Sequence, residues 1–398
     1  MNALDGLPHC RCEGCVMHPI RSAEIVDSTK TGGRRRELSA RRFGAWVQAG
    51  MVSAALLLFV GPRQSDAEEK PLKIGVLALG PRYIPAWRCG QTDYRPGSDK
   101  LKQETEPYYV LGLVDQLRKL NYIEDRPENA GKPGRHFLIS FRTGTPEQLK
   151  GFTHELIADR VDIIVGVATE AVRIAQEETR DHPIPIVMTG VSDPVKYGFV
   201  QSLGHPGGYI TGVSHQVVQG SGKRVELFKE ILPGLKRMLT VRLLGYVPSE
   251  KSMAEIREAA DRLRVDIVDR TIESRQDIQD VMASVRPDTI DGIMILPDSH
   301  IIANLDLLIE TSLARRVPAF GVFDYMAVWG AVAADGPSAH EAGALAASYV
   351  DKISKGASPA DLAVIPVDPK LVINLKAAQC LGISVPQEVL GQADQVIR

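Results

Sequence analysis

The sequence predicts an α/β protein with two lobes, each built on a doubly wound parallel sheet. From about residue 70 to the end of the chain, short apolar runs alternate with amphipathic segments, as expected when helices cover both faces of parallel strands. A Gly-rich passage around residues 204–212 separates two runs of this pattern. The chain of 398 residues, 44% of them hydrophobic, is long enough for two separate cores.

The first run of elements begins with a strand at residues 72–80, which is continuously apolar and ends at glycine. A helix follows at residues 107–122, where apolar side chains recur every three or four positions. The other expected elements of this run are strands at 137–141, 161–169 and 184–190 and helices at 146–160 and 170–180.

The second run follows the same rhythm after a helix at residues 220–231. Ser249 is a favourable N-cap for a helix that extends to about residue 263. The expected strands are 238–247, 265–270, 291–299, 318–323 and 330–337, with an extended segment at 363–374, and the other expected helices are 274–285, 301–314, 339–355 and 375–381.

Polar residues follow the carboxyl ends of these strands, where open α/β sheets bind their ligands. An amino-acid ligand needs an acid for its ammonium group and hydroxyl or backbone N–H groups for its carboxylate. Thr169 fits either an anion-binding helix start or a simple N-cap, and Ser192–Asp193 fits either a ligand contact or a capped turn. The candidate ligand-binding residues here are Thr169, Glu170, Thr189, Ser192, Asp193, Ser214, Asp298, Asp324, Tyr325 and Asp335.

Motifs of the common enzyme classes are missing from the sequence. It contains no G-x-S-x-G elbow, no G-x-G-x-x-G after the first strand and no H-E-x-x-H pair, and the "GSGKR" stretch at residues 220–224 departs from a phosphate-binding loop. His215 and His300 are loop histidines that fit either a cleft wall or a solvated surface, and a lone loop histidine is usually solvated. We therefore expect a binding protein with no cofactor and no catalytic metal; a hydrolase built on scattered Asp and His residues is the less favoured alternative.

The net charge of −2 argues against a nucleic-acid binder, which needs clustered positive charge. The dense basic residues near Arg34–Arg42 instead precede an apolar run at Phe43–Val60, and small residues follow at Ser65 and Ala67. This order is typical of a secretory signal cleaved near Ala67, with an uncleaved anchor as the alternative. The arginines before the apolar run match a twin-arginine signal only poorly.

Cysteines are few and uneven along the chain. His9, Cys10, Cys12, Cys15 and His18 have a spacing that can bind zinc, but a removable leader is the better interpretation of residues 1–67. Beyond the leader only Cys89 and Cys380 remain, and the sequence leaves open whether they pair in an oxidising compartment.

Three long stretches resemble a known family. The segment "IPIVMTGVSDPVKYGFVQSLGHPGGYITGVS" is similar to the I-P-I-V, D-P-V, S-L-x-x-P-G-G and T-G pattern of the ABC_sub_bind family of ABC-transporter substrate-binding proteins. The segment "GYVPSEKSMAEIREAADRL" and the tail from "YVDKISKGASP" to "GQADQVI" also resemble that family. The resemblance extends from about residue 72 to the C-terminus.

The resemblance implies a type I periplasmic binding fold: two lobes, three crossover strands and a small solute held between them. We expect residues 68–213 and 334–360 in the first lobe and residues 214–333 and 361–398 in the second. The implied role is a periplasmic monomer that delivers an amino acid or related metabolite to a membrane permease. Service as the ligand sensor of a signalling partner is the alternative.

Two places depart from the family pattern. The segment after the first strand, residues 81–100, is longer than usual and contains the candidate ligand-stacking residues Tyr83 and Trp87. The final crossover reads "WGAVAADGP", which puts Ala334 and Asp335 where the family usually has Ser and Tyr. Both places can border the cleft and so bear on which solute is bound.

Overall fold

The computed structural model describes residues 70–79 and 108–398, together with the backbone of residues 84–85 and 102–103. The described strands form two seven-stranded sheets and one two-stranded ribbon, β2 (Ile84–Pro85) with β3 (Lys102–Gln103). The expected signal segment, the leader residues with possible zinc-binding spacing, Tyr83, Trp87 and Cys89 lie outside the described residues. None of the described helices is long and apolar enough to span a bilayer.

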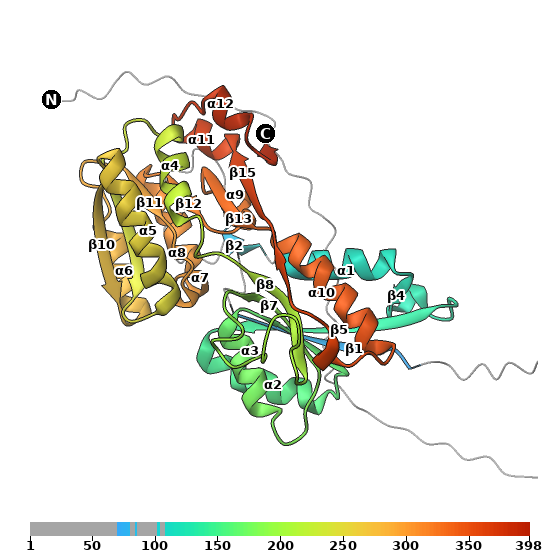
Figure 1. Cartoon of the computed structure of the whole chain (residues 1–398). Helices are drawn as coiled ribbons and strands as arrows, with labels where there is room; N and C mark the ends of the chain where they lie inside the picture. The colour runs from blue at the N-terminus through green and yellow to red at the C-terminus, as the bar shows by residue number, and fades with distance from the viewer. Residues whose placement is uncertain (1–69, 80–83, 86–101, 104–107) are drawn as a thin grey trace, which may run out of the picture. The chain divides into compact units, whose positions relative to one another are not determined.

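The first sheet has the order β14-β8-β7-β6-β1-β5-β4, and every neighbouring pair is parallel. Figure 1 shows helices on both of its faces. The strands are β1 (Leu72–Leu79), β4 (Tyr122–Glu124), β5 (Arg135–Gly144), β6 (Ile163–Val167), β7 (Ile186–Val191), β8 (Ile210–His215) and β14 (Ile365–Val367). The helices are α1 (Tyr108–Lys119), α2 (Pro146–Ala158), α3 (Thr169–Glu178) and α10 (Ala339–Ser354), with 3₁₀ turns at Pro127–Asn129 and Pro359–Asp361.

The second sheet has the order β10-β9-β11-β12-β13-β15-β16, and only β13 and β15 run antiparallel. Its strands are β9 (Arg237–Leu243), β10 (Asp266–Ile272), β11 (Gly292–Met294), β12 (Ala319–Gly321), β13 (Ala333–Pro337), β15 (Pro369–Asn374) and β16 (Gln395–Ile397). Its helices are α4 (Ser221–Ile231), α5 (Val247–Leu263), α6 (Arg275–Ser284), α7 (Ser299–Ala303), α8 (Leu305–Arg315), α9 (Asp324–Trp329), α11 (Leu375–Cys380) and α12 (Gln387–Leu390).

Each sheet carries one apolar cluster on each face, and this is why the central strands read as continuous hydrophobic runs. In the first lobe, Ile74 and Val76 pack under α1 and α10, whereas Leu77 packs toward α2 and α3.

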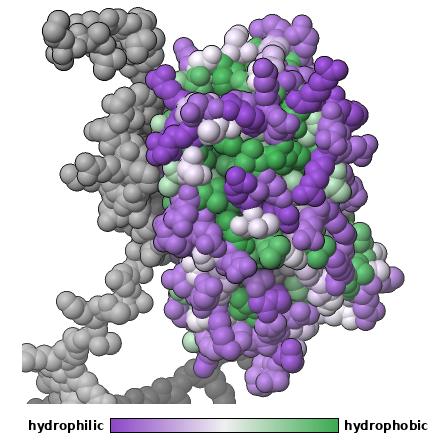
Figure 2. Space-filling model, turned by 90° about the vertical axis from the view of Figure 1, so that its left-hand side faces the viewer, coloured by the Kyte–Doolittle hydropathy of each residue, from purple (hydrophilic) through white to green (hydrophobic). Residues whose placement is uncertain are grey.

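The outer surface is more polar than these cores. Figure 2 shows the face on the β10 side as largely hydrophilic, with apolar residues gathered across its middle.

The chain changes sheet three times: after β8, after β13 and between β14 and β15. These crossovers lie a few residues later than the expected lobe boundaries at 213, 334 and 361. β13 belongs to the second sheet because Ala333 pairs with Phe320 of β12, and β14 belongs to the first because Ile365 pairs with Val213. Apolar runs identify strands but do not specify which strand each one pairs with, so the expected boundaries were displaced.

Several expected elements differ locally from the structure. Ser249 is not an N-cap: α5 begins two residues earlier, and the Ser249 hydroxyl donates to the Tyr246 carbonyl. The expected helix at 301–314 is two helices, because Asn304 leaves the helical conformation between α7 and α8. The short helix α9 and the strand β16 were not expected. Cys380, in α11, is disulfide-bonded, and the other cysteines of the chain lie outside the described residues.

Candidate functional site

The carboxyl ends of the parallel strands place loops and helix starts from both lobes near the crossovers. In the first lobe, α3 starts directly after β6, and β8 ends at His215 beside the first crossover. In the second lobe, α7 starts beyond β11, and α9 starts three residues after β12. In open α/β sheets, ligands bind at the carboxyl ends of the strands, so the candidate site lies at this edge.

Aromatic side chains from the two lobes meet at this edge, in a group that we call the hinge aromatic cluster. Tyr108, at the start of α1, stacks on Tyr325 of α9 with ring centroids 6.4 Å apart. Tyr109 lies edge-on to the same ring, also at 6.4 Å. The Phe323 ring stacks on Tyr325 at 5.6 Å, and the Trp329 ring lies tilted against Tyr325 at 5.1 Å between centroids. The cluster consists of Tyr108, Tyr109, His215, Phe323, Tyr325 and Trp329.

His215 lies within this cluster and is fully buried, which corrects the expectation of a solvated loop histidine. Its ring stacks on Tyr109 at 6.1 Å and contacts Phe323 at 5.8 Å. Nε2 is 3.5 Å from the hydroxyl of Thr189 in β7, while Nδ1 has no hydrogen-bond partner. Burial lowers the pKa of His215 to about 3, so the imidazole is neutral at ordinary pH.

Asp324 and Tyr325, both expected at the site, lie beside each other at the start of α9. The Asp324 carboxylate accepts hydrogen bonds from the backbone N–H groups of Tyr325 (2.7 Å) and Ala339 (3.0 Å). Burial nevertheless raises the pKa of Asp324, and the same carboxylate helps to raise the pKa of Tyr108 to about 12. The cluster therefore has one acid at its edge and uncharged tyrosines inside.

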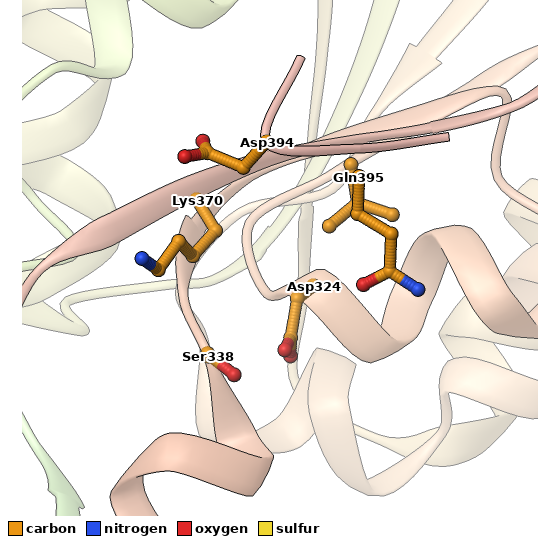
Figure 3. A pocket seen from close by; sticks show the side chains of 6 residues that line it. Asp324, Ser338, Lys370, Asp394 and Gln395 are labelled. Carbon is orange, nitrogen blue, oxygen red and sulfur yellow. The ribbon is translucent and has the colours of Figure 1, made fainter. Parts of the chain in front are cut away.

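A polar pocket of about 260 Å³ opens next to Asp324 (Figure 3). Side chains from α9, the start of α10, β15 and the start of β16 surround it: Asp324, Ser338, Lys370, Val372, Asp394 and Gln395. Asp394 of this pocket already has a partner, since its carboxylate accepts from the backbone N–H of Leu371 at 2.8 Å. It is therefore better described as a polar recess in the second lobe than as the centre of the site.

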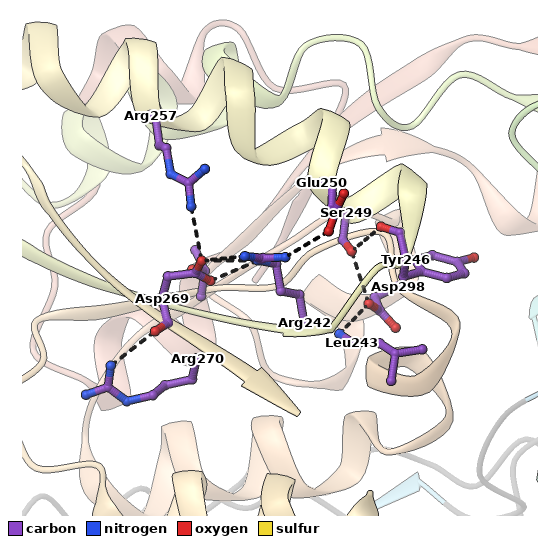
Figure 4. A network of polar contacts seen from close by, with 10 residues as sticks. Arg242, Leu243, Tyr246, Ser249, Glu250, Arg257, Asp269, Arg270 and Asp298 are labelled. Carbon is purple, nitrogen blue, oxygen red and sulfur yellow. Dashed lines mark hydrogen bonds and ion pairs between the residues drawn. The ribbon is translucent and has the colours of Figure 1, made fainter. Parts of the chain in front are cut away.

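Asp298, the most buried of the expected acids, is a structural residue. One carboxylate oxygen accepts from the backbone N–H of His300 (2.9 Å) and caps α7. The other accepts from the backbone N–H of Leu243 (2.9 Å) and from the Ser249 hydroxyl (3.2 Å), as Figure 4 shows. With both oxygens engaged, Asp298 joins β9, α5 and α7.

The candidates from β6 and β7 have mixed placements. Thr169 is the first residue of α3 and is buried, whereas Glu170 pairs with Arg173 on the same helix. Asp193 caps a turn by accepting from the backbone N–H of Lys196 at 3.2 Å, and Ser192 is half-buried beside it.

Ser214 and Asp335 are buried in the strands that lead to the first and second crossovers. Arg224 of α4 connects the first crossover to β13, because its guanidinium donates to the carbonyl oxygens of Asp335 (2.6 Å) and Val217 (2.8 Å). The Asp335 carboxylate lies 3.7 Å from the ammonium group of Lys223. Asp335 thus belongs to the hinge in this structure.

The lobes also contact each other on the side of α7. Ala303 of α7 packs against the first-lobe cluster that contains Leu77, and α7 contacts β1. Next to it, the Tyr246 hydroxyl lies 2.6 Å from the Ser299 hydroxyl, and burial raises the pKa of Tyr246 above its ordinary value. Among the described residues, no group of three or more His, Cys, Asp or Glu is placed to hold a metal ion.

Five members of the cluster were not among the candidate ligand-binding residues: Tyr108, Tyr109, His215, Phe323 and Trp329. One sequence signal could have pointed to the cluster: the adjacent tyrosines Tyr108 and Tyr109 stand at the start of the expected helix at residues 107–122. The convergence itself needed the tertiary structure, since these residues lie on elements far apart in sequence.

Comparison with known proteins agrees with this architecture. Residues 132–397 match a family model described as ABC transporter substrate binding protein. A tyrosine-binding protein of Clostridioides difficile (strain R20291) is 24% identical over 307 residues, or 74% of this chain and 87% of that protein. A solved conserved domain protein of Vibrio cholerae is 26% identical, with a TM-score of 0.62 over 82% of this chain and 100% of the other. The ABC domain from Streptococcus pneumonia in complex with L-Trp is 24% identical, with a TM-score of 0.59 over 82% and 100%.

Proposed function

The chain belongs to the family of ABC transporter substrate-binding proteins, and we propose that the solute it captures for its transporter is an amino acid with an aromatic side chain. The observation that carries this proposal is the hinge aromatic cluster, in which rings of both lobes meet at the ligand-binding edge. Stacked and edge-on rings favour a flat apolar group on the solute. A solute that contacts both lobes stabilises the closed form relative to the open one.

The polar groups around the cluster suit the rest of such a solute. Asp324 is an acid at the edge of the rings and can attract an ammonium group. Thr169 opens α3, a ten-residue helix whose first N–H groups and hydroxyl can receive a carboxylate. The relative named for tyrosine and the structure holding L-Trp support the choice of an aromatic solute as the first to test.

Closure is the working step of this protein. A solute that contacts the first lobe through α1 and β8 and the second through α9 shifts the population toward the closed form. We propose that the closed monomer presents its two lobes to the permease, and that it neither turns over its solute nor binds nucleic acid. The membrane partner follows from the family.

The place of action follows from the same family, whose members work outside the cytoplasm. We propose the periplasm for this protein, after cleavage of a secretory signal near Ala67. Sequencing the N-terminus of the exported protein tests this proposal. A first residue at or near Glu68 is expected, whereas an intact N-terminus in the membrane fraction would indicate an anchor.

Isothermal titration calorimetry of residues 68–398 against the twenty amino acids tests the solute class. We expect heat of binding and a raised melting temperature with at least one of tyrosine, tryptophan and phenylalanine, with the amino acid recovered unchanged. Binding only of non-aromatic amino acids, or of none of the twenty, would contradict the aromatic proposal and leave the family assignment intact.

A further inference from the structure

We propose that His215 is the specificity-determining residue of this site, and that its Nδ1 forms a hydrogen bond with a hydroxyl or ring N–H group on the aromatic part of the solute. The inference rests on the proposed function, because it assumes that the solute enters the hinge aromatic cluster. It adds a chemical requirement to that function: a flat solute must also carry an uncharged polar atom.

The first support is that Nδ1 is buried and unpaired. A buried polar atom without a partner costs about 1–3 kcal/mol, so native proteins rarely keep one without a reason. His215 is 0% exposed, and its Nδ1 has no partner in the structure. The other ring nitrogen has only a long contact of 3.5 Å, to the Thr189 hydroxyl. The imidazole therefore retains hydrogen-bonding capacity inside an apolar surround.

The second support is the position of the ring. His215 ends β8 at the first crossover, with Tyr109 of the first lobe stacked on it at 6.1 Å and Phe323 of the second lobe 5.8 Å away. A group that approaches this imidazole is therefore close to rings from both lobes. A hydrogen bond made here forms together with the contacts that favour closure.

The surrounding charges define what kind of polar atom fits. His215 is neutral, and Tyr109 and Tyr325 are held uncharged because burial raises the pKa of each. Asp324, at the edge of the cluster, is the acid whose charge acts on these tyrosines. A charged group placed at Nδ1 would thus be buried without a counter-charge, which is costly, while a hydroxyl or N–H group is accommodated.

Discrimination follows from this arrangement. A site built to hydrogen-bond a solute group rejects an analogue that lacks it, since the protein atom is then left buried and unpaired. Tyrosine and tryptophan carry such a group on the ring, and phenylalanine is the matched analogue without one. We expect the protein to bind tyrosine or tryptophan at least about tenfold more tightly than phenylalanine.

The experiment compares these three amino acids by calorimetry on the unmodified protein, His215→Phe, His215→Asn and the control His182→Phe, whose histidine is exposed. His215→Phe should reduce the preference to less than about threefold while phenylalanine still binds. His215→Asn keeps a hydrogen-bonding side chain and should retain part of the preference, and the control should retain all of it. Circular dichroism confirms that each variant is folded.

A second readout does not depend on any substitution. In protein labelled with ¹⁵N-histidine, the ring nitrogens of His215 should shift when tyrosine or tryptophan is added and stay nearly unchanged with phenylalanine. A preference that survives in His215→Phe, or equal affinities for all three amino acids, overturns the inference and leaves the proposed function standing. If none of the three binds the unmodified protein, the aromatic function fails and the inference fails with it.

Discussion

At the residue scale, two buried polar side chains show how burial leads to different roles. Asp298 has both carboxylate oxygens engaged by backbone and hydroxyl donors, so it ties elements of the second lobe together. His215 is as deeply buried but keeps one ring nitrogen unpaired between aromatic rings of both lobes. The satisfied group stabilises the fold, and the unsatisfied one is the atom that we propose pairs with a solute.

The low pKa of His215 predicts acid sensitivity. The folded value is about 3 and the ordinary value is 6.5, so the unfolded chain takes up a proton first as pH falls. The contribution of His215 to stability is thus fully present above pH 6.5 and is lost progressively between pH 6.5 and pH 3, by on the order of a few kcal/mol.

Urea unfolding at pH values from 7.5 to 4.5 measures this effect. The unfolding free energy of the unmodified protein should fall more steeply with acidity than that of His215→Phe. Asp324, whose raised pKa has the opposite sign of linkage, is present in both proteins and cancels in the comparison. Parallel pH curves for the two proteins would show that His215 is not buried neutral.

At the element scale, the hinge depends on one arginine. Arg224 of α4 donates to carbonyl groups on both the first crossover and β13, and it is 3% exposed. Arg224→Met removes these donors and leaves the carbonyl groups unpaired, so we expect a loss of about 3–5 kcal/mol of unfolding free energy. Arg262→Met is the matched control, because Arg262 makes an exposed ion pair with Glu226 and should cost less than about 1 kcal/mol.

Denaturant titration of both variants distinguishes these expectations. If Arg224→Met were as stable as Arg262→Met, the connection between the first crossover and β13 would contribute nothing to the fold. If Arg224→Met kept its unfolding free energy but bound the solute more weakly, Arg224 would act on the movement of the hinge and not on the stability of the fold.

The packing of α1 on α10 is a second feature of element scale, and Figure 1 shows the two helices side by side. A Cβ added at Gly343 would lie 2.0 Å from the carbonyl oxygen of Tyr109, so the helices approach as closely as they do only because glycine is there. Gly343→Ala should destabilise by roughly 1–3 kcal/mol and weaken solute binding, since it displaces Tyr109 of the cluster.

Gly151 of α2 offers the matched control for this prediction. A Cβ there meets nothing within 4 Å, and alanine in a helix interior is favoured over glycine. Gly151→Ala should therefore raise the unfolding free energy by up to about 1 kcal/mol, with a slightly higher melting temperature, and leave the solute affinity unchanged. Equal effects of the two substitutions, measured by thermal unfolding and calorimetry, would contradict the close-packing argument.

At the scale of the whole molecule, capture depends on contact between the lobes. Ala303 of α7, a helix of the second lobe, packs against the first-lobe cluster that contains Leu77. Ala303→Glu puts a charge into this contact and should favour the open form, with solute affinity reduced about tenfold and little change in unfolding free energy without solute.

Small-angle X-ray scattering with and without solute tests this prediction directly. The unmodified protein and the control Ala283→Glu, at an exposed position of α6, should both contract when solute is added. Ala303→Glu should contract less at the same solute concentration. Identical contraction and affinity in all three proteins would mean that the α7 contact does not take part in closure.

Much of this protein follows from local patterns in its sequence. Continuous apolar runs identify buried parallel strands such as Ile163–Val167, and periodic ones identify the helices between them, because burial on both faces or on one face dictates those periods. Strand–helix alternation then implies two doubly wound lobes, and the long motifs point to the family. Thr169 and Tyr325 could be selected because polar and aromatic residues at strand ends gather at one edge.

Other features were decided only by the tertiary structure. Asp298 caps α7 through the nearby N–H of His300, but its second oxygen is engaged by donors from Leu243 and Ser249, about fifty positions away. His215 looks like an exposed loop residue until Tyr109 and Phe323 cover it. For polar side chains such as these, burial and pairing depend on neighbours distant in sequence, so the residues around them do not encode the outcome. The sequence alone therefore determined the architecture and the class of protein, whereas only packing between the lobes decided which polar side chains are paired and which, like His215, are buried without a partner.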